Sequence, residues 1–367
     1  MKLRLAKPGT DFIFLFVVMA LVSVGLVMIF SASPTLGLRL GDSYHYLKRH
    51  VAHLAIGMAA LLLGMGLDYH YLKKYATPVL LAVTAMLFMV FIPGLGRSVG
   101  GAVRWIDVFG FSFQPSEIAK MAIVIYLASV FSSWKAAGRE ALKIILVALI
   151  PVIFISFLVL KQPDLGTTLV MGGTAFIMLF LAGVPWAYLL TLGGLSGAML
   201  VILSLTSGYR MRRIIAFFDP WGSPHTIGFH IIQSLLAIGS GGLFGLGLGG
   251  SRQKFFYLPQ HYTDFIFSIL SEELGFLGAL GVVVLFIIFT IRGIRIARFA
   301  RDEFGCLLAG GIVSWIALQS IINLYVVTGL FPTTGIPLPF ISFGGTSLIV
   351  TLFAVGVLLN IGRRAES

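Results

Sequence analysis

Charged residues are scarce in this sequence. Only 11% of its 367 residues are Asp, Glu, Lys or Arg, whereas 58% are hydrophobic. About a quarter of the residues in soluble globular domains are charged, so this composition excludes that class. With a mean hydropathy of +1.00, the chain is predicted to be an integral membrane protein.

Cysteine is almost absent. The single Cys306 excludes an internal disulfide, and its simplest interpretation is a small buried apolar residue. No cluster of His and Cys has the spacing of metal ligands. The sequence therefore requires no cofactor, although a divalent cation held by Asp264 or a neighbouring acid stays open.

Acidic residues are fewer than basic residues, and the formal net charge is +12. The basic residues are scattered between apolar runs instead of forming one patch, which excludes a nucleic-acid-binding protein.

A nucleotide-binding loop is also missing. The stretch "IGSGGLFGLGLGGSRQK" follows no strand, opens no βαβ unit and does not end in Gly-Lys-Ser. Flexible turns are the favoured interpretation. The alternative is a weak anion site, since clustered glycines can direct backbone N–H groups at an anion, and Arg252 and Lys254 come directly after them.

Long apolar runs are what the sequence does have. They predict an all-α polytopic membrane protein with about ten transmembrane helices, because each run approaches the roughly 20 residues that cross a bilayer. The expected spans are 12–31, 51–67, 76–93, 116–133, 142–160, 165–183, 186–206, 264–291, 305–329 and 340–361. The first run follows a basic lead like that of a signal peptide, but it is too long for a signal core, so it is expected to stay as a span. No internal repeat appears, and residues 1–367 are expected to form one domain.

The basic residues orient these spans. Fourteen Lys and Arg lie on the side of the N-terminus and eleven on the other side, five of them in the long segment 207–263 between spans seven and eight. Long loops count little in such comparisons. Both termini are therefore expected in the cytoplasm and segment 207–263 outside.

On this topology Asp264 falls at the outer end of a span. Ser268, Ser271 and Gly275 share its helical stripe, with Glu272 beside them. Ionisable residues in membrane helices usually face the protein interior and carry function, so the stripe is expected to line a cavity. The alternative is that Asp264 only caps its helix.

Two further acids start helices at the same face. In "FQPSEIAK", Pro115 and Glu117 mark a helix start, and Lys120 lies on the same face as Glu117. In "KQPDLGT", Pro163 is expected to open a helix with Asp164 in its first turn. Each acid has a structural alternative, which is an ion pair with Lys120 for Glu117 and a charged turn between two spans for Asp164. Gln319 and Asn323, four residues apart, are expected to be interhelical hydrogen-bonding residues.

These motifs together resemble one family. "FQPSEIAK", "KQPDLGT", "IIQSLLAIGSGGLFGLGLGGSRQKFFYLP", "TDFIFSILSEELG" and "NLYVVTGLFPTTGIPLPFISFGGTSL" are similar to motifs of the shape, elongation, division and sporulation (SEDS) proteins, the group of RodA, FtsW and SpoVE. The amino-acid sequences of these motifs resemble those of FtsW and SpoVE more than those of RodA. Gln260, Tyr262 and Phe343 depart from the residues usual in that family.

The resemblance implies a peptidoglycan glycosyltransferase of the bacterial plasma membrane. Such an enzyme polymerises lipid II into glycan strands at the outer face, with a class B penicillin-binding protein as partner transpeptidase. By motif position the family's essential aspartate corresponds to Asp264, which is expected to act as general base. One base and cations suffice, since the leaving lipid diphosphate is already a stable anion.

The expected substrate-binding residues surround this base. They are Glu117, Lys120, Asp164, Arg104, Trp105, Arg210, Arg213, Arg252 and Lys254. Each basic residue has the alternative of an ordinary interfacial charge at lipid headgroups. Two other functions stay open: a transporter of lipid-linked sugar, and a non-catalytic scaffold for a cell-wall synthase.

Overall fold

The computed structural model describes most of the chain. The described residues are 11–34, 37, 41–99, 102–108, 111–137, 141–206, 208–224, 226, 228–254 and 262–365. The predictions that rest on Lys2, Arg4, Lys7, Arg139 and Gln260 concern residues outside these ranges.

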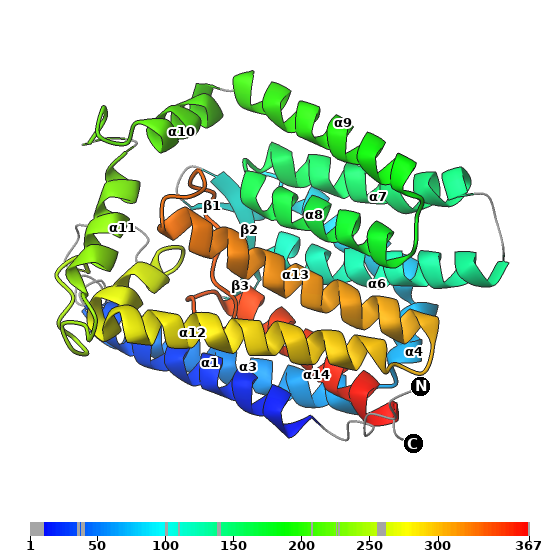
Figure 1. The fold of residues 1–367 in the computed structure, drawn as a ribbon, viewed down its shortest axis with the longest axis horizontal. Coiled ribbons are helices and arrows are strands. Elements are labelled where there is room, and N and C mark those ends of the chain that lie inside the picture. The colour runs from blue at the N-terminus through cyan, green and yellow to red at the C-terminus, as the bar shows by residue number, and fades with distance from the viewer. Residues whose placement is uncertain are drawn as a thin grey trace.

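Long helices run side by side and form a bundle (Figure 1). The helices of the described residues, long and short, are α1 (Phe12–Ala32), α3 (His45–Gly66), α4 (Tyr69–Lys74), α5 (Ala76–Met89), α6 (Pro115–Ala137), α7 (Ala141–Lys161), α8 (Leu165–Leu181), α9 (Trp186–Leu205), α10 (Gly208–Phe218), α11 (Phe229–Ser240), α12 (Ile266–Arg298), α13 (Glu303–Val327) and α14 (Gly345–Arg364). The fold is therefore that of a helical polytopic membrane protein, as predicted.

Eight of these helices are long and apolar enough to cross a membrane: α1, α3, α6, α7, α9, α12, α13 and α14. The other two predicted spans coincide with α5 and α8, which have 14 and 17 residues. At 1.5 Å per residue these reach about 21 and 26 Å, short of a 30 Å hydrocarbon core. A count of ten spans stays a prediction.

A small antiparallel sheet accompanies the helices and was not expected. Its strands β1 (Gly96–Val99), β2 (Ala102–Val108) and β3 (Phe111–Phe113) follow one another in space in that order. Arg97 and Asp107 form an exposed ion pair at 3.2 Å across β1 and β2. The sheet leads directly into α6. Strand β2, which carries Arg104, therefore lies near the start of α6.

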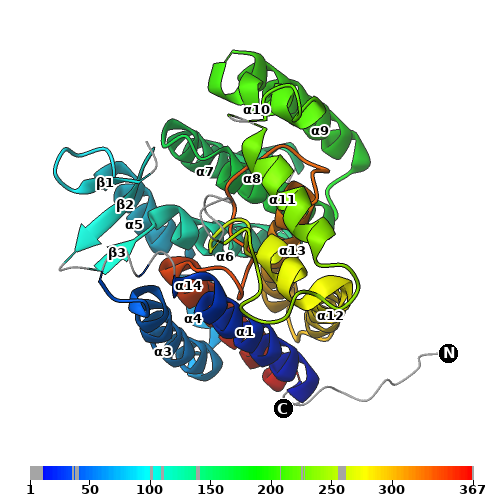
Figure 2. The same ribbon diagram turned by 90° about the vertical axis from the view of Figure 1, so that its left-hand side faces the viewer.

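The long segment 207–263 contains two helices that do not run with the bundle. Figure 1 shows α10 and α11 at one end of the bundle, with α11 lying across it, and Figure 2 shows the same end face on. The beginning of α1 and the end of α14 lie toward the opposite end (Figure 1). The bundle therefore has one end capped by segment 207–263 and one end that carries both ends of the described chain.

Helix α12 is broken at Gly275, whose φ of 70° and ψ of −169° are not helical. The glycine-rich stretch supplies the backbone hydrogen-bond partners that the break removes. Leu246 N and Gly247 N each donate over 3.0 Å to the carbonyl oxygens of Glu272 and Glu273, which the break leaves without helical partners, and Phe276 N donates to Gly242 O over 2.8 Å. The stretch therefore forms defined backbone hydrogen bonds with a discontinuous helix instead of free turns. The weak anion site stays a prediction.

Candidate active site

Asp264 lies two residues before α12 and is half-buried. Its side chain does not cap that helix, since the N-cap position is Phe265 and has no side-chain hydrogen bond. The alternative that Asp264 is only a cap is therefore wrong. Asn323 of α13 donates over 2.8 Å to the Asp264 carbonyl and over 2.7 Å to the Ile336 carbonyl, which ties Asp264 to the segment that follows α13.

That segment approaches the carboxylate through a glycine. Gly335 has a φ of +76°, and a Cβ built on it would lie 3.4 Å from Asp264 Oδ2. The left-handed conformation and the close approach both favour glycine there. The Asp264 carboxylate therefore lies close to the backbone at Gly335, with no side chain of that residue between them.

Burial and four neighbours set the pKa of the Asp264 carboxyl. Burial and the negative charge of Asp164 raise it, whereas the positive charges of Arg104 and Arg213 and a hydrogen bond from Thr263 oppose the rise, and the net pKa is about 6. Asp264 therefore keeps a higher proton affinity than an ordinary aspartate and still ionises near neutral pH.

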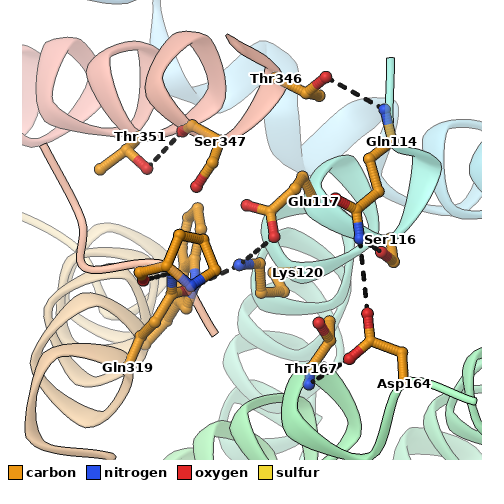
Figure 3. Close-up of polar contacts among 12 residues, drawn as sticks. Gln114, Ser116, Glu117, Lys120, Asp164, Thr167, Gln319, Thr346, Ser347 and Thr351 are labelled. Carbon is orange, nitrogen blue, oxygen red and sulfur yellow. Dashed lines mark hydrogen bonds and ion pairs between the residues drawn. The ribbon is translucent and has the colours of Figure 1, made fainter. Parts of the chain in front are cut away.

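Asp164 stands at the start of α8 and is buried. Its Oδ1 accepts from Thr167 N over 3.0 Å, so Asp164 is the N-cap and the helix begins at Leu165; the prediction that Pro163 opens it was wrong. Its Oδ2 lies 3.7 Å from Arg104 Nη1 and accepts from Gln114 over 3.4 Å. Figure 3 shows Gln114 and Thr167 reaching the two oxygens from opposite sides.

A cavity of about 460 Å³ opens beside this group. Its charged lining consists of Arg104, Arg210 and Arg213, three of the residues expected to bind substrate. The apolar lining comes mainly from α7, α8, α9 and α10: Leu160, Leu165, Leu169, Leu200 and Ile214. Thr333 and Thr334 close the side nearest Gly335. The cavity thus combines positive charge with an apolar wall, part of which comes from α7 and α9, two of the helices long enough to span a membrane.

All three arginines donate to backbone carbonyls, and Arg210 does so through Nη1 to Leu203 O over 3.1 Å. Arg213 Nη1 donates to Thr333 O over 2.6 Å, and Arg104 Nε donates to Gln162 O over 3.0 Å. Arg104 also donates to the Pro163 carbonyl. Their positive charge is therefore held in place around the cavity. The carbonyls do not neutralise it, and only that of Arg104 is opposed by a carboxylate among the ion pairs given above, Asp164.

Glu117 and Lys120 of α6 form a buried ion pair, with Lys120 Nζ 2.8 Å from Glu117 Oε1. Lys120 also donates to Gln319 Oε1 over 2.7 Å, and Gln319 Nε2 donates to the Pro337 carbonyl over 2.9 Å (Figure 3). Neither residue of the pair lines the cavity. The pair instead holds, through Gln319, the segment that carries Gly335, which matches the structural alternative; direct contact with substrate stays a prediction.

Lys254 lies in a different network. Its Nζ is 3.0 Å from Glu273 Oε1, which also accepts from Ser31 of α1 over 2.7 Å. Arg252 is exposed, and its backbone N donates to Glu272 Oε1 over 2.8 Å. Neither basic residue lines the cavity, so its charge comes from the arginines of β2 and α10 as far as the described residues are concerned.

The polar stripe of α12 does not face the cavity, contrary to the prediction. Ser268 contacts Ser234 of α11 at 2.7 Å, and Ser271 donates to the Phe267 carbonyl. Glu272 accepts from Ser251 of the glycine-rich stretch. The stripe failed as a cavity signal because another helix and a loop of the same chain pack on it.

Trp105 is half-buried in β2, where it pairs with Arg97 of β1, and it is not part of the cavity lining. Thr333 and Gly335 were missed by the sequence reasoning. Their signal is present in "FPTTGIPLP", which was read only as part of a motif. Within the described residues, no three His, Cys, Asp or Glu side chains come together as a metal site.

Comparison with known proteins agrees with the fold. Residues 11–367 match the family model of FtsW, RodA and SpoVE, described as cell cycle protein. The chain is 45% identical over 361 residues to stage V sporulation protein E of Bacillus subtilis, covering 97% of this chain and 98% of that protein. It is 44% identical to a probable peptidoglycan glycosyltransferase FtsW of Geobacter sulfurreducens, covering 97% and 96%.

Two solved structures are also similar. One chain of a peptidoglycan synthase complex, solved for the coordination of polymerization and crosslinking, has a TM-score of 0.77 and 31% identity, with 97% of this chain and 98% of that chain covered. Rod shape determining protein RodA of Thermus thermophilus has a TM-score of 0.72 and 29% identity, with the same coverage. The chain therefore belongs to the FtsW, RodA and SpoVE family of cell cycle proteins.

Proposed function

We propose that this protein is a peptidoglycan glycosyltransferase that polymerises lipid II, with Asp264 as its general base. The observation that carries the proposal is the position of Asp264, a carboxylate with raised pKa. Asp264 is not itself a lining residue of the arginine cavity, but the charges of Arg104 and Arg213, which do line it, act on its carboxylate. The relatives named as probable peptidoglycan glycosyltransferases support the same activity.

The reaction requires one proton acceptor. The 4-hydroxyl oxygen of the acceptor sugar attacks the anomeric carbon of the donor, and its proton passes to Asp264. The bond from the anomeric carbon to the lipid diphosphate breaks, and its electron pair leaves with the diphosphate. Attack opposite the leaving group inverts the anomeric carbon. A carboxylate with a pKa near 6 is ionised at neutral pH and is a stronger base than an ordinary aspartate.

The donor fits the cavity in two respects. Arg104, Arg210 and Arg213 would stabilise the negative charge of the departing diphosphate, since preorganised cations act most strongly where charge develops. The apolar wall formed by α7, α8, α9 and α10 would accept the lipid chain near the diphosphate. The walls of the site would be held in place by Glu117, Lys120 and Asp164, which would thus act on the substrate indirectly.

The proposal includes an orientation and a partner. The bundle end with α10 and α11 would face outward from the bacterial plasma membrane and both termini inward, as the basic residues predict. A class B penicillin-binding protein would crosslink the strands; the similar chain of a peptidoglycan synthase complex supports this. Residues 1–367 would form one membrane domain.

The test is polymer formation from purified lipid II by the full chain, alone and with a co-expressed class B penicillin-binding protein. We expect Asp264→Ala to reduce the rate by at least about 100-fold, the range of a lost general base. Asp219→Ala is the matched control, because Asp219 is an exposed acid of the same long segment, and it should keep the activity of the unmodified protein.

Unchanged polymerisation by Asp264→Ala would overturn the base assignment. A protein that moves lipid II between leaflets of a vesicle but forms no polymer would be a transporter, and one that only alters the rate of its partner would be a scaffold. Polymer formation without any partner synthase would contradict both.

A further inference from the structure

An aromatic cluster adjoins Asp264 and has no role in the scheme above. Tyr46 of α3 lies 5.1 Å from Tyr262 and 5.6 Å from Phe343, measured between ring centroids, and Tyr262 lies 5.7 Å from Phe343. All three rings are half-buried and keep part of their surface accessible. We call these three residues the aromatic shelf.

The shelf is tied to Asp264 by backbone contacts. Phe343 N donates to the Tyr262 carbonyl over 3.0 Å, and Ser342 Oγ donates to the Thr263 carbonyl over 2.6 Å. Tyr262 is two residues from Asp264, and the negative charge of Asp264 acts on its hydroxyl. The shelf and the base are consequently parts of one local structure.

Helix packing holds the rings in place. Tyr46, His50 and His53 share one face of α3, and the His50 and His53 rings lie 6.0 and 6.5 Å from Phe343. α3 packs closely along α14 in both ribbon views (Figures 1 and 2). Rings supported from behind lose little freedom when they bind a ligand.

We propose that Tyr46, Tyr262 and Phe343 bind the ring of the acceptor sugar and present its 4-hydroxyl to Asp264. This inference rests on the proposed function, because it names the acceptor side of the same reaction. The donor side needs positive charge for its diphosphate, and the arginine cavity supplies it. The shelf, in contrast, carries aromatic faces and two hydroxyls and no charged side chain of its own.

This chemistry fits a neutral saccharide. The C–H groups of a pyranose pack on an aromatic face, and phenol hydroxyls exchange hydrogen bonds with sugar hydroxyls. The Tyr46 and Tyr262 ring centroids are 5.1 Å apart, and burial together with the neighbouring Tyr46 and Asp264 raises the pKa of Tyr262 to about 12. Tyr262 therefore stays a neutral phenol at any working pH. The charged or titratable groups around the shelf are Asp264, His45, His50 and His53, with Arg49 beside His53.

The test separates acceptor from donor. The full chain receives a fixed concentration of lipid II and a varied concentration of a lipid-free, reducing-end-capped disaccharide with a free 4-hydroxyl. We expect Tyr46→Ala to raise the KM for this acceptor about tenfold, the effect of losing one ring contact, while kcat changes less than about threefold. Tyr46→Phe keeps the ring and should change this KM by less than about threefold.

Tyr44→Ala is the matched control. Tyr44 precedes the same end of α3, is exposed and stacks only on Phe30 among the described rings, so its loss should leave the acceptor KM unchanged. Melting temperatures of all variants separate a lost contact from a lost fold. Phe343→Leu serves as a second variant with the same expectation as Tyr46→Ala.

Binding of the same disaccharide is also measured without lipid II, by saturation-transfer difference NMR on the protein in nanodiscs. A signal that Tyr46→Ala removes and Tyr44→Ala keeps supports the shelf even if no polymer forms, in which case the proposed function alone fails. Tyr46→Ala and Phe343→Leu variants that fold and keep both the acceptor KM and the NMR signal would overturn the inference.

Discussion

At the scale of single residues, the position of Asp264 could be predicted, but its surroundings could not. An aspartate at the mouth of an apolar helix is visible in the sequence. The residues that set its pKa come from α8, β2 and α10, which are 51 to 160 positions away, and no local pattern links them. Arg252 and Lys254 are nearer in sequence and were expected at the site, yet Lys254 pairs with Glu273.

The burial of Asp264 predicts a pH-dependent stability. Its pKa of about 6 lies above the ordinary value of 3.8, so folding favours the protonated form. This contribution is fully present below pH 3.8 and is lost as the pH rises through 6. The side chain introduced by Asp264→Asn cannot ionise, so the stability of this variant does not fall as the pH rises through 6.

We therefore expect Asp264→Asn to be more stable than the unmodified protein at pH 8, by up to about 3 kcal/mol, and equally stable near pH 4. Thermal melting in nanodiscs at the two pH values measures this difference. A variant that is less stable at pH 8 would show that the ionised carboxylate is well stabilised, and would contradict the raised pKa.

At the scale of elements, α12 shows what hydropathy can and cannot predict. The apolar run predicted a span over 264–291, and the helix covers 266–298. The break at Gly275 could not be predicted, because it depends on carbonyl and N–H partners from the glycine-rich stretch. The left-handed glycines of that stretch, such as Gly245 and Gly247, are needed to place its backbone against α12.

This arrangement predicts opposite outcomes for two glycines of α12. At Gly275 a Cβ would meet backbone, with Leu243 O at 2.6 Å, and the φ of +70° disfavours any other residue. At Gly281 nothing lies within 4 Å. We expect Gly275→Ala to lower the free energy of unfolding by at least about 2 kcal/mol.

Gly281→Ala should instead leave stability unchanged or raise it by up to about 1 kcal/mol, as alanine does within a helix. Melting temperatures of the two variants in the same nanodiscs make the comparison. Equal effects at both positions would show that the break is not a fixed feature of the fold.

At the scale of the whole molecule, composition and apolar runs predicted the class and most of the helices. The small sheet was missed because its strands are short and stand next to glycines. The helices α10 and α11 were missed because a long loop between spans was expected to be irregular. Both omissions concern the capped end of the bundle, where the functional residues come together.

The orientation of the bundle remains a prediction of the basic residues, and cysteine labelling tests it. In a Cys306→Ser background, we introduce Trp221→Cys between α10 and α11 and Arg301→Cys between α12 and α13; both original residues are exposed. A membrane-impermeant maleimide on intact spheroplasts should label the first variant only, and the second after permeabilisation. The reverse pattern would place the arginine cavity on the cytoplasmic side.

The pH dependence of polymerisation tests the central claim most directly, namely that Asp264 is the base and that the charges around it set its pKa. The rate should rise with pH and level off above an inflection near 6, because only the ionised carboxylate accepts a proton. Arg213→Gln removes a positive charge and should move the inflection upward, Asp164→Asn should move it downward, and Arg213→Lys should leave it in place. An inflection that none of these substitutions moves would contradict the account.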